Sequence, residues 1–166
     1  MDHTGWRSRG YLPHCDGAGI IHHLVISTLG ASEGIEKHFG VWHFADPRAA
    51  TIVEDALLHF DGVRYRALAW CVMPNHAHAV LEQAEGWPLS SIAHSWKSFT
   101  ANAVNKAVGR TGPLRTREYF DRFMRDDDHL STTIAYVENN PVTAGLAGTV
   151  DDWQWSSARR RRTSKA

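Results

Sequence analysis

The chain has 166 residues, 43% of them hydrophobic, which is enough for one compact domain with a buried core but marginal for two. It carries 18 basic and 18 acidic residues, so its total charge does not favour a nucleic-acid partner and counts against promiscuous binding. Two cysteines are too few for a disulfide framework or a four-cysteine zinc site, and no apolar run approaches the roughly 18 residues that span a bilayer. Because the N-terminus also lacks the apolar stretch of a secretory signal, we expect one cytoplasmic domain over residues 1–166, with less ordered ends at 1–19 and 158–166.

The first predicted elements are a strand and a helix. Residues 20–28, with the sequence IIHHLVIST, are β-branched and apolar and lie between two glycines, which predicts a strand. Asp46 and Pro47 are typical of the start of a helix, and apolar residues recur at helical spacing from there to Gly62.

A pair of strands is predicted next, at residues 64–72 and 76–82. Met73-Pro74-Asn75 between them predicts a hairpin-like turn. Simple alternation divides the first of these strands into two faces. One face carries Tyr65, Ala67, Ala69 and Cys71, and the other carries Arg66, Leu68, Trp70 and Val72.

The second half of the chain repeats the pattern of helix and strand. A wide apolar stripe from Leu89 to Ala107 predicts a helix that Gly109 ends. A strand is predicted at residues 119–124, and a last helix begins at the acidic residues 126–128 and ends before Pro141. The order strand, helix, strand, strand, helix, strand, helix predicts an α+β fold: a ferredoxin-like βαββαβ core with an antiparallel sheet and an added C-terminal helix.

Two histidines stand two residues apart in the strand predicted at 76–82. Residues i and i+2 of a strand point to the same face, so His76 and His78 can share one metal ion. The chain has 11 histidines, and such a spacing also arises by chance, as the neighbours His22 and His23 illustrate. The alternative is therefore a pair of histidines on a half-exposed strand.

The last predicted helix separates an apolar stripe from a polar one. The apolar stripe consists of Leu130, Ile134 and Val137, and the polar stripe of His129, Thr133, Tyr136 and Asn140. Tyr136 is thus off the core stripe and in line with Asn140, whose amide oxygen can bind a metal ion. If the polar stripe meets the histidine pair, a tyrosine hydroxyl and a metal ion share one pocket.

Such a pocket suits phosphoryl transfer. Cleavage of a phosphodiester needs an in-line nucleophile and positive charge at the phosphate oxygens, which a metal ion supplies as Lewis acid and template. A tyrosine stores the cleaved bond as a phosphotyrosine ester, so a second DNA end can reverse the step without a nucleotide cofactor. The hydroxyl needs a base or the field of the metal to lose its proton, and His129 is a candidate base.

Basic residues outnumber acidic residues between Trp96 and Arg125. The candidate contacts to DNA phosphates there are Lys97, Lys106, Arg115, Arg117 and Arg122. The alternative is a solvated helix face and loop. The arginine run at residues 159–162 can likewise bind phosphates or form a solvated end.

Five ordered motifs carry a family resemblance. They are Met73-Pro74-Asn75-His76-Ala77-His78, Trp96-Lys97-Ser98-Phe99-Thr100, Tyr119-Phe120-Asp121, the block from Tyr136 to Leu146, and Trp153-Gln154-Trp155-Ser156-Ser157. Together, over roughly residues 20–157, the chain resembles the single-tyrosine HUH transposases, and among them the REP-associated tyrosine transposases. It departs from that pattern at Arg115 and Thr116, where relatives commonly carry tryptophan and glutamine, and in the segment before Ile20.

The resemblance implies a metal-dependent endonuclease and strand-transferase that acts on single-stranded DNA with hairpin or palindromic elements. It implies His76 and His78 as metal ligands with Asn140 as the third, Tyr136 as nucleophile, and magnesium or manganese as the metal. The products are a 5′-phosphotyrosine link and a free 3′-hydroxyl. We expect a monomer or homodimer associated with the nucleoid.

Two other functions stay open from the sequence. One is a catalytically silent protein that binds DNA hairpins, and the other is a hydrolytic metalloenzyme that acts on another phosphate ester through a bound water. Tyr119 is a rival nucleophile, but a strand aromatic beside Phe120 and Phe123 is more typical of a core or of a base-stacking platform.

Overall fold

A four-stranded antiparallel sheet is the centre of the structure, a computed structural model that describes residues 5–9, 12–28, 44–114 and 119–165. Its strands lie in the order β4-β5-β3-β6. They are β3 (Ile21–Ser27), β4 (Tyr65–Val72), β5 (His76–Gln83) and β6 (Phe120–Phe123). With the helices between them, this order gives the antiparallel βαββαβ arrangement predicted from the sequence.

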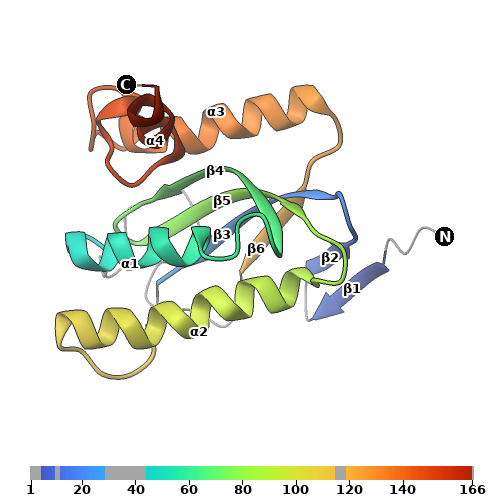
Figure 1. The fold of residues 1–166 in the computed structure, drawn as a ribbon, viewed down its shortest axis with the longest axis horizontal. Helices are drawn as coiled ribbons and strands as arrows, with labels where there is room; N and C mark the ends of the chain where they lie inside the picture. Colours follow the sequence, from blue (N-terminus) through green and yellow to red (C-terminus); the bar gives the residue numbers. More distant parts are fainter. Residues whose placement is uncertain (1–4, 10–11, 29–43, 115–118, 166) are drawn as a thin grey trace.

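Helices cover both faces of this sheet (Figure 1). One face packs against α1 (Pro47–Leu58) and α2 (Leu89–Val108), and the other against α3 (Asp127–Thr143) and α4 (Ser157–Ser164). The remaining elements are the hairpin β1 (Gly5–Arg9) and β2 (Leu12–Asp16) and the 3-10 helix η1 (Val150–Asp152). The hairpin of β1 and β2 and most of α4 fall within the two ranges expected to be less ordered, and that expectation stays a prediction. Within the described ranges, no helix combines the length and apolar content needed to cross a bilayer.

The helix ends follow the signals in the sequence, except that α1 ends at Leu58, short of the predicted Gly62, and that α3 continues past its predicted end. The Asp46 side chain accepts from the backbone N–H of Arg48 at 2.8 Å, and Gly109 ends α2 with a φ of 67°, which an L side chain rarely adopts. α3 was predicted to end before Pro141 but runs to Thr143. Pro141 has no N–H to donate to the carbonyl four residues earlier, but the last turn still closes, because Ala144 donates to the Asn140 carbonyl at 3.0 Å and Leu146 to the Pro141 carbonyl at 2.8 Å.

The predicted alternation of β4 is wrong from its middle onward. The pairing of β4 with β5 shifts register between Ala67 and Ala69, which marks a β-bulge. An extra residue reverses the phase of alternation, so Trp70 lies in the core beneath α1 and α2 together with Tyr65. Cys71 lies on the other face, in the core beneath α3.

The two faces of the sheet bury separate apolar clusters. Leu24, Ala79 and Leu81 belong to the larger cluster, which α1 and α2 cover. Val80 belongs to the smaller one, which packs against Val137 of α3. The predicted core stripe of α3 is therefore confirmed, and α3 lies with one fixed side on the sheet.

The C-terminal segment holds α3 in place. The indole N–H of Trp153 donates to the Val72 carbonyl at 2.9 Å, so this segment packs on the domain. The Ser157 hydroxyl accepts from the Trp70 N–H at 3.0 Å and donates to the buried Glu138 carboxylate at 2.6 Å. Arg161 of α4 pairs with the same carboxylate. Because Glu138 is on α3, this network joins α3, α4 and β4.

Replacing Glu138 with alanine is expected to lower the free energy of unfolding by about 1–3 kcal/mol. The substitution removes the pair with Arg161 and leaves the buried Ser157 hydroxyl only the longer contact to the Trp70 carbonyl, at 3.3 Å. Urea unfolding monitored by circular dichroism measures the change. The matched control is Glu82→Ala, which removes an exposed pair with Arg66 and is expected to change stability by no more than about 0.5 kcal/mol. Equal changes in the two variants contradict a structural role for the Glu138 network.

Candidate active site

The predicted histidine pair lies in the middle of the sheet, on the face that α3 covers. His76 and His78 alternate along β5 with Ala77 and Ala79, which pack on the opposite face. The Nε2 atoms of the two imidazoles are 3.0 Å apart, and their rings meet nearly at right angles, at 81°. Two ring nitrogens therefore converge on one point.

A third histidine extends this pair, and sequence reasoning missed it. His23 on β3 lies 2.9 Å from His78, measured from its Nε2 atom to Nδ1 of His78, and the two rings stack with centroids 5.2 Å apart. The strand register explains the contact. β3 pairs with β5 so that His23 lies opposite Val80, which is two residues from His78 on the same face of β5. The alternation of the predicted strand places His22 and His23 on opposite faces, but only the register shows that His23 is the one on the face of His78.

Burial disfavours the charged form of His78 and of His23. It lowers the pKa of the fully buried His78 well below its usual value, and the neighbouring His76 and His23 lower it further. Burial also lowers the pKa of His23 to about 4, with smaller electrostatic effects from Arg122 and His129. A neutral imidazole carries one proton and one lone pair, so each ring can both donate and accept.

The hydrogen bonds orient the outer ring of the pair. The Asn75 side-chain oxygen lies 2.6 Å from Nδ1 of His76, and an amide oxygen only accepts, so this nitrogen carries the proton. The Nε2 atom of His76 then presents its lone pair to His78. If the Nδ1 atom of His78 carries the proton and donates it to His23, the Nε2 atom of His78 has a lone pair. The Nε2 lone pairs of His76 and His78 then point to one position between the two rings.

This donor set fits a metal ion. Two ligands at right angles around an octahedral ion, each at about 2.1 Å, are about 3.0 Å apart. The two Nε2 atoms are 3.0 Å apart. In the described part of the chain, no group of three or more His, Cys, Asp or Glu side chains is arranged to hold a metal. The third predicted ligand, Asn140, is of another type; it is half-buried on α3, one turn after Tyr136.

Tyr136 lies directly against the histidines. Its ring centroid is 5.8 Å from that of His78 and 6.2 Å from that of His23, both in edge-to-face contact. Its side chain is 43% exposed, whereas Val137 beside it is fully buried. The structure therefore brings together, in one chain, a tyrosine that solvent can reach and the imidazole pair of the partly buried His76 and the buried His78.

The predicted phosphate contacts do not all gather at this place. Lys97 and Lys106 are on α2, on the other side of the sheet from Tyr136. Arg122 of β6 lies opposite His23 of β3 in the strand register, so its side chain is on the same face of the sheet as His23 and Tyr136. Arg115 and Arg117 lie outside the described residues.

The rival nucleophile Tyr119 also belongs to the opposite side of the sheet. It is partly buried against the cluster beneath α1 and α2, and the Lys97 ammonium lies 5.5 Å from its ring centroid. This position supports the interpretation of Tyr119 as a packing residue and not as the nucleophile.

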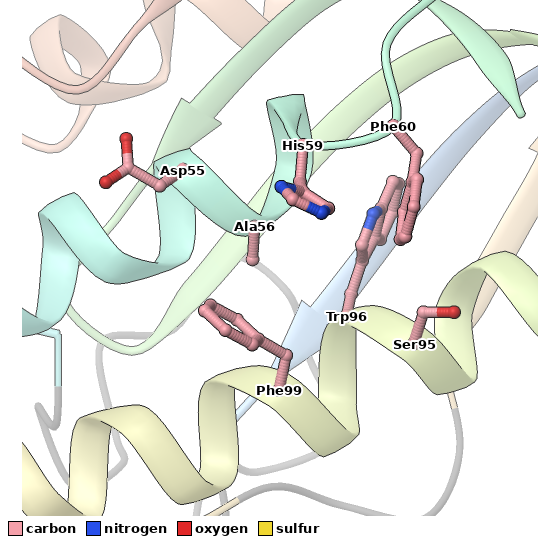
Figure 2. Close-up of a pocket in the computed structure, with 7 residues that line it drawn as sticks. All are labelled: Asp55, Ala56, His59, Phe60, Ser95, Trp96 and Phe99. Carbon is pink, nitrogen blue, oxygen red and sulfur yellow. The ribbon is translucent and has the colours of Figure 1, made fainter. Parts of the chain in front are cut away.

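A cavity of about 200 Å³ opens between α1 and α2, on the opposite side of the sheet from α3. Figure 2 shows Phe60, Trp96 and Phe99 around it, with His59 and Asp55 at its rim. Its lining includes none of the predicted site residues, so the chemistry predicted from the sequence lies on the other face of the sheet.

Residues 48–140 match the family described as IS200-like transposases. This segment covers more than half of the chain, and it contains the histidine pair, Tyr136 and, as its last residue, Asn140. The chain belongs to the IS200-like transposase family. The match begins within α1, so it covers three of the four strands of the main sheet, β4, β5 and β6, and leaves out β3.

Relatives of this transposase-family chain agree with the branch suggested by its motifs. A Haemophilus influenzae protein that carries the name REP-associated tyrosine transposase is 26% identical over 106 residues. The matched region is 58% of this chain and 60% of that protein, so the chain aligns with less than two thirds of its relative.

Solved structures share the fold. A REP-associated tyrosine transposase bound to a REP hairpin superimposes with a TM-score of 0.65 at 17% identity, over 93% of this chain and 83% of the other. A Deinococcus radiodurans protein named as a transposase gives a TM-score of 0.50 at 18% identity, over 80% and 95%. These similarities confirm the α+β fold predicted from the order of elements.

Proposed function

We propose that this chain is a metal-dependent endonuclease and strand-transferase that cuts single-stranded DNA beside a hairpin, with Tyr136 as nucleophile. One observation carries the proposal: an exposed tyrosine on α3 contacts a buried histidine whose Nε2 atom is 3.0 Å from that of a second histidine. Tyr136 therefore offers a nucleophilic oxygen on the exposed side of α3, next to a histidine pair that can hold a positively charged metal ion. Both are needed for phosphodiester cleavage.

His76 and His78 hold the metal in this proposal, with the Asn140 amide as third ligand and magnesium or manganese as the ion. When bound, the ion supplies positive charge to the phosphate oxygens. His76 and Asn75 act before any metal arrives, because their hydrogen bond at 2.6 Å fixes the ring so that its free lone pair faces His78. A fixed ligand avoids the cost of being ordered during binding.

Tyr136 carries the covalent step. Its hydroxyl oxygen forms a bond to phosphorus while the bond from phosphorus to the 3′ oxygen breaks, and the tyrosine proton leaves to a base or to water. The chain keeps the 5′ phosphate as a phosphotyrosine ester, and the DNA keeps a free 3′-hydroxyl. Because one phosphoester replaces another, a second 3′-hydroxyl can reverse the reaction and join two ends.

Hairpin DNA is the proposed substrate. The solved transposase with a similar fold is bound to a REP hairpin, and the Haemophilus influenzae relative carries the name of the same class. A chain that acts on such DNA works at the nucleoid, as a monomer or homodimer. The contact between Tyr136 and His78 within one chain supports an active site that one protomer completes.

The direct test is covalent labelling. A fluorescent single-stranded oligonucleotide that carries an imperfect hairpin and its flanking strand is incubated with the protein and magnesium or manganese, and the products are separated on a denaturing gel. We expect a labelled protein band that a metal chelator prevents. Tight hairpin binding without this band, across both metals, instead favours a catalytically silent binding protein.

His23 is expected to affect metal binding without touching the metal. Replacing it with phenylalanine keeps the ring but removes the acceptor 2.9 Å from Nδ1 of His78. Loss of such an indirect partner typically weakens metal binding by about 10–100-fold. Titration with Mn²⁺ followed by electron paramagnetic resonance measures the dissociation constant.

The control for His23 is the same substitution at His94, an exposed histidine on α2. We expect His94→Phe to leave Mn²⁺ affinity unchanged, and thermal unfolding shows whether both variants are folded. Equal Mn²⁺ affinity in folded His23→Phe and wild-type protein contradicts the role of His23.

A further inference from the structure

Beside the tyrosine, the edge of the sheet presents an exposed aromatic ring. Phe120 of β6 is 36% exposed, although strand phenylalanines are usually core residues. Its ring lies 6.5 Å from that of His23 in edge-to-face contact, and His23 in turn contacts Tyr136. An aromatic surface open to solvent thus lies one residue away from the proposed nucleophile.

The register of the sheet fixes the face that Phe120 occupies. Val25 pairs with His78 on one side and with Phe120 on the other, so the three side chains form a row across the same face. Leu24 pairs with Asp121, whose side chain therefore points to the opposite face, beneath α2. The carboxylate of Asp121 is thereby kept away from this surface.

The helix above leaves this side of the sheet accessible. α3 packs mainly over β4 and β5, whereas β6 is the outer strand beyond β3. Phe120 and Tyr136 are both among the exposed large hydrophobic side chains of the described residues. Tyr136 is thus at the margin between the covered and the open part of this face.

A positive charge accompanies the ring. Arg122 is exposed, pairs with His23 across the strands, and is close enough to lower the pKa of that histidine. Residues i and i+2 of a strand lie on one face about 6.8 Å apart. Phe120 and Arg122 therefore form an aromatic and cationic pair beside Tyr136.

We propose that Phe120 stacks on an unpaired base of the DNA strand next to the phosphate that Tyr136 attacks, while Arg122 contacts a neighbouring phosphate. The proposal rests on the proposed function and names the part of the DNA that this surface holds. Every base has an apolar face, so stacking on an aromatic ring combined with nearby positive charge binds single strands with little regard for sequence. The arginine favours a polyanion as occupant over a second copy of this chain, whose formal net charge is zero.

The test compares two probes that differ only in their bases. One is a fluorescein-labelled single strand of about twelve thymidines, and the other is an abasic deoxyribose-phosphate strand of the same length. Binding to the full chain is measured by fluorescence anisotropy with a metal chelator present, so that no cleavage occurs. We expect Phe120→Ala to weaken binding of the thymidine strand about five- to tenfold and to leave binding of the abasic strand unchanged.

Three further variants sharpen this comparison. Phe120→Trp keeps a stacking surface and is expected to bind as wild type does. Phe99→Ala removes a phenylalanine that is 57% exposed on the opposite side of the sheet, and it is expected to bind both probes normally. Arg122→Ala is expected to weaken binding of both probes alike, because phosphates are present in both.

Several results overturn the proposal. One is that the wild-type chain binds the thymidine strand no better than the abasic strand. Another is that Phe120→Ala has wild-type affinity for both probes, or loses the same affinity for both. A dimer that forms without DNA and dissociates in Phe120→Ala also overturns it. The covalent labelling test distinguishes this proposal from the proposed function. If the adduct forms and Phe120→Ala binds both probes as wild type does, the chain is an enzyme without this stacking surface. If Phe120 contributes base-dependent binding but no adduct forms, the stacking surface exists and the proposed cleavage activity does not.

Discussion

A chain carrying Tyr136→Phe is expected to bind hairpin DNA as wild type does and to form no covalent adduct. Phenylalanine keeps the ring that contacts His78 and His23 but lacks the oxygen that would join phosphorus. The side chain is 43% exposed, so the substitution leaves no buried polar group unpaired and the fold should be unaffected. Denaturing gels measure the adduct, and anisotropy with labelled hairpin measures binding.

Tyr119→Phe is the matched control for this loss. It makes the same chemical change at the rival tyrosine, which packs on the opposite side of the sheet. We expect this variant to form the adduct at a rate close to that of wild type. An adduct that persists in Tyr136→Phe and disappears in Tyr119→Phe contradicts the assignment of the nucleophile. Release of free 5′-phosphate by Tyr136→Phe at the wild-type rate instead indicates hydrolysis by water.

The fold was predictable from the sequence wherever local chemistry determines it. The helix starts at Asp46 and Asp126 and the end at Gly109 follow from single side chains that cap a helix or adopt a left-handed backbone. The bulge in β4 was not predictable, since it depends on how two distant strands pair. The continuation of α3 past Pro141 depends likewise on packing that local propensity does not contain.

The site divides in the same way. His76 and His78 share a face because of strand alternation, and Tyr136 leaves the core because of helical periodicity, and both facts were readable from spacing. His23 entered the site only through the register between β3 and β5, which brings together residues 55 positions apart. Lys97 and Lys106 were grouped with the site because they share a basic stretch of sequence. The fold places α2 beneath the other face.

A chain carrying His76→Gly is expected to form the adduct on the order of a thousandfold more slowly than wild type. The substitution removes one of the two nitrogens that converge at 3.0 Å, and with it the proposed hold on the metal. Charge stabilisation by a metal contributes several kcal/mol to such reactions, and each 1.36 kcal/mol is a factor of ten in rate. His76 is the better choice for this test than His78, because it is only partly buried while His78 is completely buried.

Free imidazole in solution tests whether the lost nitrogen is what matters. His76 is the first residue of β5 and is partly accessible to solvent. Added imidazole can therefore enter the space that glycine leaves and restore a metal ligand. We expect it to raise the adduct rate of His76→Gly and to leave that of Tyr136→Phe at zero. A His76→Gly chain with the full rate in the absence of imidazole contradicts a metal site at this pair.

Mixing these two variants locates the site within the oligomer. Each chain retains what the other lacks, so a site built from the tyrosine of one protomer and the histidines of another would regain activity in the mixture. Tyr136 contacts His78 of its own chain, with ring centroids 5.8 Å apart, so we expect no regain. Recovered adduct formation would mean that α3 supplies its tyrosine to a partner during catalysis, and the contact seen within one chain would then be a resting arrangement.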